Sequence, residues 1–448
     1  MRCGFCHDRY LSSARKNKVP RRKWLKVVGG VAALSFLSHQ SSLQCGAAKQ
    51  DITPDVKARA IPLGGYGDRM GKPATGVHDP IFARAILLSD GKRKVAIVGT
   101  DLLFVSEPLR RAVLQKIAET GIGDDSLFLT ATHSHAAPEA MAMNKRNIFQ
   151  NPRIGIFDQW LFDFTVEGIA QAVSEANKNL RPAKFGWASK TVKELHRNRR
   201  SSKVTDDELF VLRFDGLDGR PIAAVVNYAA HPTILSAKCM EISGDWCGWL
   251  ERQMEKALDD NAVVLFLNGA EGDQSPNPPG GETEFERVEQ MGKAMLDHAL
   301  SLYCQVQLKS DGDLASKVIR APLPKRVAHP QFEEIAGREY GVSKESLSLM
   351  LHQLFPDYAL VMTVRIGDVV FIGIPGEPIA QIGLNIKAAA KGKGVTMPVV
   401  VGLANDYIGY ILTADEYRRG GYEATVSFYG EALGKVIEEV ALLAIAEM

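Results

Sequence analysis

Short apolar stretches rich in Val and Ile alternate with longer amphipathic stretches along most of the chain. The apolar stretches predict β-strands, and the amphipathic ones predict helices. The predicted strands 208–214 and 221–228 are joined by a turn rich in Asp and Gly, which predicts an antiparallel hairpin. A purely parallel sheet is therefore disfavoured. We predict an α/β fold with mixed parallel and antiparallel sheets flanked by helices.

The remaining predicted elements are spread over the whole chain. The other predicted strands cover 94–100, 126–132, 263–267, 359–366, 369–374 and 399–403. The predicted helices cover 107–119, 157–179, 246–259, 283–302, 379–391 and 430–446. No linker clearly divides this part of the chain, so we expect one large domain over residues 49–448.

The N-terminal segment has the composition of an export signal. Residues 1–26 hold nine Lys or Arg and one Asp, and Val27–Leu37 is an apolar run too short to span a bilayer. Arg21 and Arg22, followed by an aromatic residue and a Leu, resemble the twin-arginine export motif. We therefore expect residues 1–45 to be an export signal, the protein to be periplasmic or extracellular, and the mature chain to have no transmembrane helix.

The net charge of the chain depends strongly on this segment. The whole chain has a formal charge of +2, and residues 1–26 contribute nine positive charges and one negative, or +8. The remainder therefore carries about −6, from +2 minus +8. Binding to a nucleic-acid backbone requires a cluster of basic side chains, and no basic stripe remains. We expect no nucleic-acid partner.

Polar side chains of metal-binding type follow several of the predicted strands. His133 and His135 are two residues apart, so in an extended segment they point to the same side. His231 ends a predicted buried strand, and Glu377 follows another strand through a Gly. Neutral imidazoles and a carboxylate suit Zn²⁺, which lowers the pKa of its bound water to about 7. A single histidine at a strand end is more often structural, so spacing alone leaves both readings open.

Five short motifs occur in the order found in one enzyme family. They are Thr132–His135, Asn227–His231, Gly272–Asn277, Pro375–Glu377 and Tyr407–Glu423. In this respect the chain resembles the catalytic N-terminal domain of the neutral/alkaline non-lysosomal ceramidases. The resemblance covers nearly all of the chain after the export segment.

The resemblance implies a role for eight residues. It implies zinc binding by His133, His231, Glu377 and Tyr410, and a place around the scissile amide for Ser275, His135, Arg199 and Tyr422. Tyr410 is preferred to Tyr407 because the twelve-residue interval from 410 to 422 matches the two site tyrosines of the family. Arg197 and Arg200 are adjacent alternatives to Arg199. Whether Ser275 attacks the substrate or donates a hydrogen bond stays open.

The implied activity is that of an exported zinc-dependent hydrolase of linear amide C–N bonds, cleaving ceramide or a related N-acyl, lipid-like substrate. Peripheral contact with a membrane is a further expectation. Residues 320–358 have little obvious counterpart in the family, so the metal chemistry transfers better than the substrate.

Three alternatives compete with this interpretation. One is a non-catalytic exported binding protein on the same scaffold. Another is a metal-free serine amidase or esterase, although no Gly-x-Ser-x-Gly elbow surrounds Ser275. The last is a metallo-β-lactamase-like enzyme, which would require Asp where the chain has Ala137.

Overall fold

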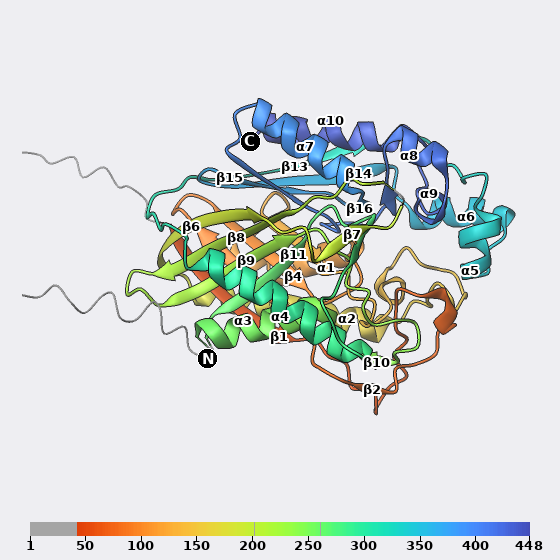
Figure 1. The fold of residues 1–448 in the computed structure, drawn as a ribbon, viewed down its shortest axis with the longest axis horizontal. Helices are drawn as coiled ribbons and strands as arrows, with labels where there is room; N and C mark the ends of the chain where they lie inside the picture. Colours follow the sequence, from red (N-terminus) through yellow and green to blue (C-terminus); the bar gives the residue numbers. More distant parts are fainter. Residues whose placement is uncertain (1–42, 201, 260) are drawn as a thin grey trace, which may run out of the picture.

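The computed structural model describes residues 43–448 except Ser201 and Asp260. Its core has four layers, with two sheets face to face and helices on both outer sides (Figure 1). The larger sheet has the strand order β11-β9-β8-β6-β1-β3-β4-β5. Its strands are β1 (Gln44–Asp51), β3 (Phe82–Ser89), β4 (Lys94–Thr100), β5 (Leu127–Ala131), β6 (Arg181–Thr191), β8 (Glu208–Gly216), β9 (Pro221–Tyr228) and β11 (Val263–Asn268). The pairs β4/β5 and β9/β11 are parallel, and the other neighbours are antiparallel.

The smaller sheet has four strands in the order β13-β14-β15-β17. They are β13 (Leu314–Pro322), β14 (Tyr358–Ile366), β15 (Val369–Gly373) and β17 (Met397–Val401). A buried apolar cluster joins the two sheets, and within it the ring of Phe210 packs edge-on against that of Phe371, with centroids 6.0 Å apart. Removal of this apolar surface from water holds the two sheets together.

Helices cover the outer face of each sheet (Figure 1). On the larger sheet, α1 (Glu107–Lys116) and α2 (Gln159–Lys178) cover the half with β3 to β5, while α3 (Asp245–Leu258) and α4 (Glu284–Tyr303) cover the half with β8, β9 and β11. On the smaller sheet lie α7 (Ala380–Gly392) and α10 (Leu433–Ala446). No helix in the described ranges is long and apolar enough to cross a membrane.

Short elements gather at one end of the molecule (Figure 1). The helical ones there are α5 (Arg338–Tyr340), α6 (Lys344–Leu354), α8 (Ala414–Arg419) and α9 (Tyr422–Thr425). The short helices η1, η2, η3 and η4 cover Gly67–Arg69, Ala118–Thr120, Ala140–Met143 and Glu333–Gly337. Three two-stranded ladders pair β2 (Gly76–Val77) with β10 (Glu241–Ile242), β7 (His196–Asn198) with β12 (Gln274–Pro276), and β16 (Glu377–Pro378) with β18 (Tyr410–Ile411).

The predicted fold class and the predicted hairpin, now β8 and β9, are confirmed. The sequence analysis did not predict strands β1, β3, β6 and β13 or helix α6. Strand β3 was missed because it carries Arg84 in an otherwise apolar run. In the structure Arg84 is buried, and its Nη1 lies 2.9 Å from Asp101 Oδ2 and 2.8 Å from Glu251 Oε2. These ion pairs, to the end of β4 and to α3, make a buried charge tolerable, and no local pattern in β3 reveals them.

The described part of the chain begins inside the segment predicted to be an export signal. Strand β1 starts at Gln44, and the buried Cys45 pairs with Leu88 of β3. The paired arginines and the apolar run lie outside the described residues.

Candidate functional site

His133 and His135 follow the C-terminal end of β5, as the sequence predicted. His133 has a φ of 77°, in the left-handed region that non-glycine residues rarely occupy. Two hydrogen bonds hold this turn: the His133 backbone N–H donates to the carbonyl of Leu102 at 3.0 Å, and its Nδ1 lies 2.6 Å from the carbonyl oxygen of Leu103. The strained turn therefore fixes the direction of the His133 ring.

His231 lies three residues beyond the end of β9. Its backbone N–H donates to the carbonyl of Gln274 at 2.9 Å, and its Nδ1 lies 2.7 Å from the carbonyl oxygen of Glu271. Asn268, at the end of β11, donates through Nδ2 to the carbonyls of Thr132 and Ala230. This one side chain ties the end of β5 to the segment that carries His231.

Glu377 and Tyr410 are adjacent because β16 and β18 pair in parallel. The register sets Glu377 opposite Tyr410. The Glu377 N–H donates to the carbonyl of Gly409 at 3.1 Å, and Gly409 has a φ of 85°. A Cβ at Gly409 would come within 2.5 Å of the Val426 carbonyl oxygen, so glycine is required both for the conformation and for the close approach.

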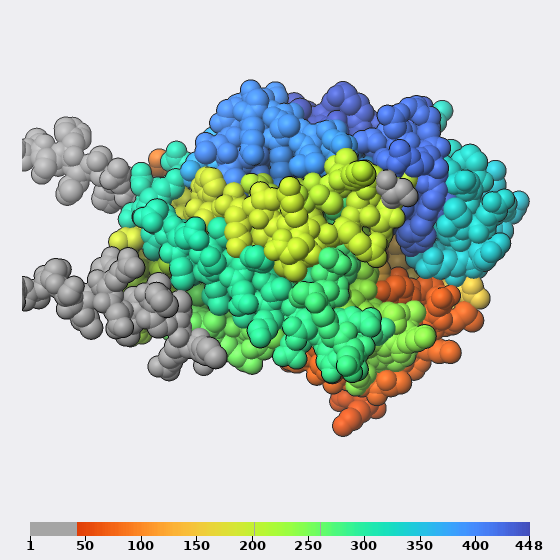
Figure 2. Space-filling model, viewed as in Figure 1, coloured from red at the N-terminus to blue at the C-terminus, as the bar shows by residue number. Residues whose placement is uncertain are grey.

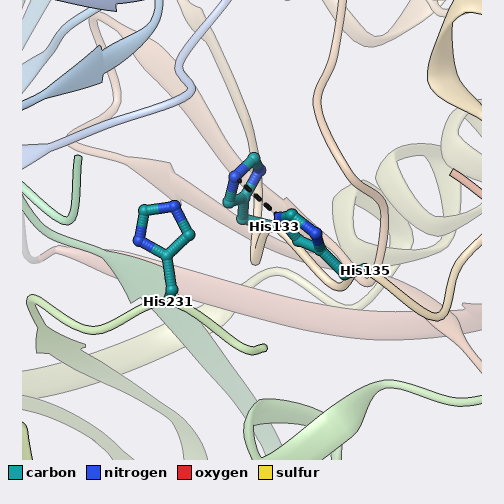
Figure 3. Close-up of side chains that lie close together, drawn as sticks. All are labelled: His133, His135 and His231. Carbon is teal, nitrogen blue, oxygen red and sulfur yellow. Dashed lines mark hydrogen bonds between the residues drawn. The ribbon is translucent and has the colours of Figure 1, made fainter. Parts of the chain in front are cut away.

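The side chains from these three places converge. Oε2 of Glu377 lies 3.2 Å from Nε2 of His133 and 3.2 Å from Nε2 of His231. The Tyr410 hydroxyl lies 3.4 Å from Nε2 of His231. His135 places its Nε2 3.3 Å from Nε2 of His133, and Figure 3 shows these two rings side by side, with the His231 ring across from them.

Hydrogen bonds define which imidazole nitrogens are free. The Nδ1 atoms of His133 and His231 each donate to a backbone carbonyl, so each Nε2 carries a lone pair. These two lone pairs face the same carboxylate oxygen of Glu377, with no proton to lie between them. A cation removes the resulting repulsion. The arrangement therefore fits a metal ion, and the ligating atoms of His133, His135 and His231 all lie within 4.8 Å of one another.

The electrostatics of the site favour ligand chemistry. Burial, together with the neighbouring imidazoles, lowers the pKa of His135 well below its usual value. Burial and the positive charge of Arg199 lower the pKa of His231 to about 4. Burial works to raise the pKa of Glu377, but the positive charge that His133 and His231 carry in their protonated forms outweighs it and holds this pKa well below the usual value. Neutral imidazoles beside an ionised carboxylate are the forms that bind a metal.

The site opens into a cavity of about 150 Å³. The polar part of its wall includes His133, His135, Glu377, Tyr407, Tyr410 and Tyr422. The apolar part includes Leu347, Met350 and Leu354 of α6, together with Phe355 and Phe428. A mostly apolar wall with a few convergent polar groups is typical of a binding site for a largely apolar small molecule.

Neither Arg199 nor Ser275 is among the described residues that line this cavity. Arg199 donates from Nη2 to the Tyr410 hydroxyl at 2.9 Å and from Nε to Oε1 of Glu423 at 2.7 Å. Arg200 pairs with Glu416 and also with Glu423, and it makes no contact with Tyr410 among the described hydrogen bonds. Of the two, Arg199 is therefore the one that reaches a candidate metal ligand.

Ser275 belongs to β12, where it pairs with Arg197 of β7. The preceding residue, Gln274, accepts the backbone hydrogen bond of His231. The Ser275 backbone is thus fixed beside that of His231. Within the described ranges, no hydrogen bond connects the Ser275 hydroxyl to the three histidines.

The sequence analysis weighed Tyr407 only as an alternative to Tyr410, and it missed Tyr340. The Tyr407 hydroxyl donates to Oε1 of Glu377 at 2.7 Å, and its ring stacks on Phe104 with centroids 4.1 Å apart. The Tyr340 hydroxyl lies 2.9 Å from the Tyr422 hydroxyl. The proximity of Tyr407 to Tyr410 in the sequence was a usable signal. No sequence signal pointed to Tyr340.

A buried acid also lines the cavity and was not predicted. The Glu139 carboxylate accepts a hydrogen bond from the backbone N–H of Met141 at 3.0 Å. Burial raises the pKa of Glu139 to about 7. Its only sequence signal was its place four residues after His135, which is weak.

The fold and this histidine–carboxylate site define the class of protein. The family model described as "Neutral/alkaline non-lysosomal ceramidase, N-terminal" matches residues 43–294 and 344–437. The chain belongs to this family. Residues 295–343 lie outside the match.

Individual relatives are distant in sequence. The chain is 22% identical to the neutral ceramidase of Pseudomonas aeruginosa, over 86% of this chain and 69% of that one. It is 23% identical to the neutral ceramidase of Mycobacterium tuberculosis, over 86% of this chain and 75% of that one. The crystal structure of the Pseudomonas aeruginosa enzyme superposes with a TM-score of 0.78 at 22% identity, covering 91% of this chain and 74% of that chain. This structural likeness supports the same fold.

Proposed function

We propose that this protein is a zinc-dependent hydrolase that cleaves the amide bond of ceramide or a related N-acyl, lipid-like substrate. One observation carries the proposal: two imidazole lone pairs and a carboxylate oxygen converge at the wall of a largely apolar cavity. The substrate class is supported by relatives that are named neutral ceramidases, and by a solved structure of the same fold described as a ceramidase complexed with C2.

Zinc is the metal that we propose for the site. Its nitrogen and oxygen ligands lie at about 2.0–2.2 Å in a tetrahedron, so neighbouring ligand atoms are roughly 3.3–3.6 Å apart. The separations of 3.2 to 3.4 Å among His133, His231, Glu377 and Tyr410 are close to this spacing. When bound, zinc would polarise the substrate carbonyl and lower the pKa of a water molecule.

The residues around the metal site can move protons and hold the substrate. His135 lines the cavity, and burial with the neighbouring imidazoles lowers its pKa, so a neutral His135 can take a proton from the nucleophile and pass it to the leaving amine. Tyr422 faces the cavity and can donate to the oxygen of the scissile carbonyl. Arg199 would act on the substrate only through Tyr410, because its guanidinium contacts that hydroxyl.

For Ser275 we retain two roles, attack on the carbonyl or donation of a hydrogen bond. Donation would be supported if Ser275→Ala still turned over substrate at a measurable rate and intact-protein mass spectrometry found no acyl-enzyme in the wild type. A trapped acyl group on Ser275 would support attack.

The experiment that tests the proposed function combines metal analysis with an amide-hydrolysis assay. We expect about one zinc per chain in the wild type, by analogy with mononuclear sites. His133→Ala and Glu377→Ala should lose both the zinc and the cleavage of fluorescent short- and long-chain N-acylsphingosines. His298→Ala is the matched control, because His298 contacts Lys190 and Glu194 rather than the site. A metal-free, inactive wild type would favour the non-catalytic binding protein, whereas a metal-free active one would favour the serine amidase.

We also propose that the cavity receives its substrate at a membrane surface. Met70, Ile148 and Leu349 are exposed to 47, 63 and 65% on three segments that meet beside the cavity. Contacts between the segments show that they are neighbours: Gly71 is so close to Pro152 that a Cβ at Gly71 would touch it, and Asn151 donates to the Tyr340 carbonyl. Figure 2 shows the cyan segment around α6 next to the orange segment around residue 70. Exposed apolar side chains around an apolar cavity are typical of a surface that contacts lipid.

The test of membrane contact is sedimentation with phosphatidylcholine vesicles that contain ceramide. Leu349→Glu should weaken vesicle binding and leave hydrolysis of a water-soluble short-chain substrate unchanged. Leu217→Glu is the control, since Leu217 is 60% exposed but lies in the β8–β9 turn. Equal binding by both variants would contradict the assignment of this surface.

Export by the twin-arginine route is the last part of the proposal. It is supported by Arg21 and Arg22 ahead of an apolar run. Because β1 begins at Gln44, signal cleavage before Leu43 would leave the sheet intact. In a bacterial host with this translocase, the double variant Arg21→Lys/Arg22→Lys should stay in the cytoplasmic fraction while the wild type reaches the periplasm. Unchanged export of the double variant would contradict the route.

A further inference from the structure

Tyr340 reaches the site from a part of the chain that the family model does not match. It ends the short helix α5, within the unmatched residues 295–343. Its hydroxyl lies 2.9 Å from that of Tyr422, and its side chain lines the cavity together with Phe332 and Val342 from the same segment. This segment therefore completes one wall of the cavity.

The backbone around Tyr340 is anchored to the body of the protein. Nδ2 of Asn151 donates to the Tyr340 carbonyl at 3.0 Å. Nη1 of Arg153 donates to the carbonyls of Arg338 and Glu339, each at 3.2 Å. Hydrogen bonds from two side chains of another segment thus hold α5. These contacts fix the backbone from which the Tyr340 side chain extends.

The contact between the two hydroxyls can have two orientations. A tyrosine hydroxyl has one proton and can also accept. If Tyr422 donated to Tyr340, its proton would be used and could not reach a substrate. If Tyr340 donates, the Tyr422 oxygen accepts and its own proton stays free for the cavity. A hydroxyl that accepts a hydrogen bond is also a better donor, because bonded chains polarise one another.

The surroundings of Tyr422 favour a donor role. Its ring is edge-on to that of Tyr410, with centroids 6.0 Å apart, which sets Tyr422 beside a candidate metal ligand. Tyr422 also lines the cavity, so its hydroxyl lies where a substrate could accept a hydrogen bond from it.

We propose that Tyr340 is a positioning residue: its hydroxyl donates to the Tyr422 oxygen and so holds the Tyr422 proton toward the carbonyl oxygen of the substrate. Tyr340 itself does not touch the reacting atoms. This inference rests on the proposed amide hydrolysis and deepens it, because it gives the unmatched segment a role in that reaction.

The kinetic test uses Tyr340→Phe, which removes the hydroxyl and keeps the ring in the cavity wall. With a water-soluble short-chain N-acyl substrate, kcat should fall about five- to tenfold and KM should change by less than about twofold, the effect of one lost hydrogen bond in the transition state. The same substitution in a Tyr422→Phe background should cause no further loss, because the interaction is already gone. Tyr303→Phe is the control, since it deletes a buried hydroxyl that donates to Asp215, and neither residue lines the cavity.

A second measurement does not depend on activity. In protein labelled with 3-fluorotyrosine, the fluorine resonance of Tyr422 is identified by its absence in Tyr422→Phe. We expect this resonance to shift in Tyr340→Phe and to stay in place in Tyr303→Phe. A wild type that cleaves no N-acyl substrate counts against the proposed function, and the fluorine shift then decides on the hydroxyl contact separately. An unmoved Tyr422 resonance, an unchanged kcat in an active enzyme, or a further loss in the Tyr422→Phe background overturns the proposal.

Discussion

Replacing Tyr407 by Phe should weaken metal binding without disturbing the packing around it. The Tyr407 hydroxyl donates to Oε1 of Glu377 at 2.7 Å, while the other carboxylate oxygen, Oε2, faces the histidines. The ring stacks on Phe104 and a Phe ring can keep that contact. A hydrogen bond to a charged group contributes about 1.5–3 kcal/mol, and such support of a metal ligand changes metal affinity about 10- to 100-fold. We therefore expect the zinc Kd of Tyr407→Phe to rise by about one to two orders of magnitude.

Competition with a chromogenic chelator measures this change directly. The matched control is Tyr429→Phe, because the Tyr429 hydroxyl also donates at 2.7 Å, in this case to the Pro356 carbonyl, and lies outside the site. The control should keep the wild-type zinc Kd even if its thermal stability falls. A zinc Kd for Tyr407→Phe within about threefold of wild type would refute the claim that this hydroxyl orients Glu377.

Three further predictions concern the surroundings of the site. Gly65 has a φ of 87°, and a Cβ there would come within 2.6 Å of Cγ of His135. Because Gly65→Ala should displace the His135 ring, we expect it to retain zinc and to lose about 100-fold in kcat. Loss of zinc, measured by metal analysis, would contradict this. The pKa of Glu139 in the folded protein is about 7, against an ordinary value of 4.5. The free energy of unfolding of the wild type should therefore fall as pH rises from 4.5 to 7, by up to about 3 kcal/mol relative to Glu139→Gln. Urea titrations at several pH values measure this, and parallel pH profiles for the two proteins would contradict it. Arg69 donates to the carbonyls of Gly64, His135, Ser236 and Cys239. Arg69→Met should therefore lower the free energy of unfolding by more than about 3 kcal/mol, and a loss below about 1 kcal/mol would count against this network.

The elements that local pattern could identify were predicted well. The strand that became β5 is a run of apolar and β-branched residues, so its end and the histidines beyond it were visible in the sequence. The β8–β9 hairpin was visible in its turn residues. Strand β3 was not, because Arg84 breaks its apolar pattern and is stabilised by carboxylates from the end of β4 and from α3.

The candidate site was only partly predictable for a similar reason. His133 and His135 were expected to face one side because alternate residues of an extended segment do so. Their rings do lie close together, but His133 has a φ of 77°, so the left-handed turn brings them together rather than strand alternation. That His231 joins them depends on Asn268, which ties the ends of two strands that are distant in the sheet order. Tyr410 lies opposite Glu377 in the β16–β18 ladder, and Tyr407, just before that ladder, donates to one oxygen of Glu377, so both contacts depend on this pairing.

The sequence by itself determined which residue types could carry the chemistry, their order along the chain and the strands that end beside them. These are properties of a few neighbouring residues, and hydrophobic periodicity and turn chemistry report them. Only the tertiary structure decided that the Nε2 atoms of His133 and His231 face the same oxygen of Glu377, and that Tyr340 meets Tyr422. These contacts join residues that are 82 to 244 positions apart, as 422 minus 340 and 377 minus 133 show, and they depend on sheet order and layer packing, which no local pattern encodes.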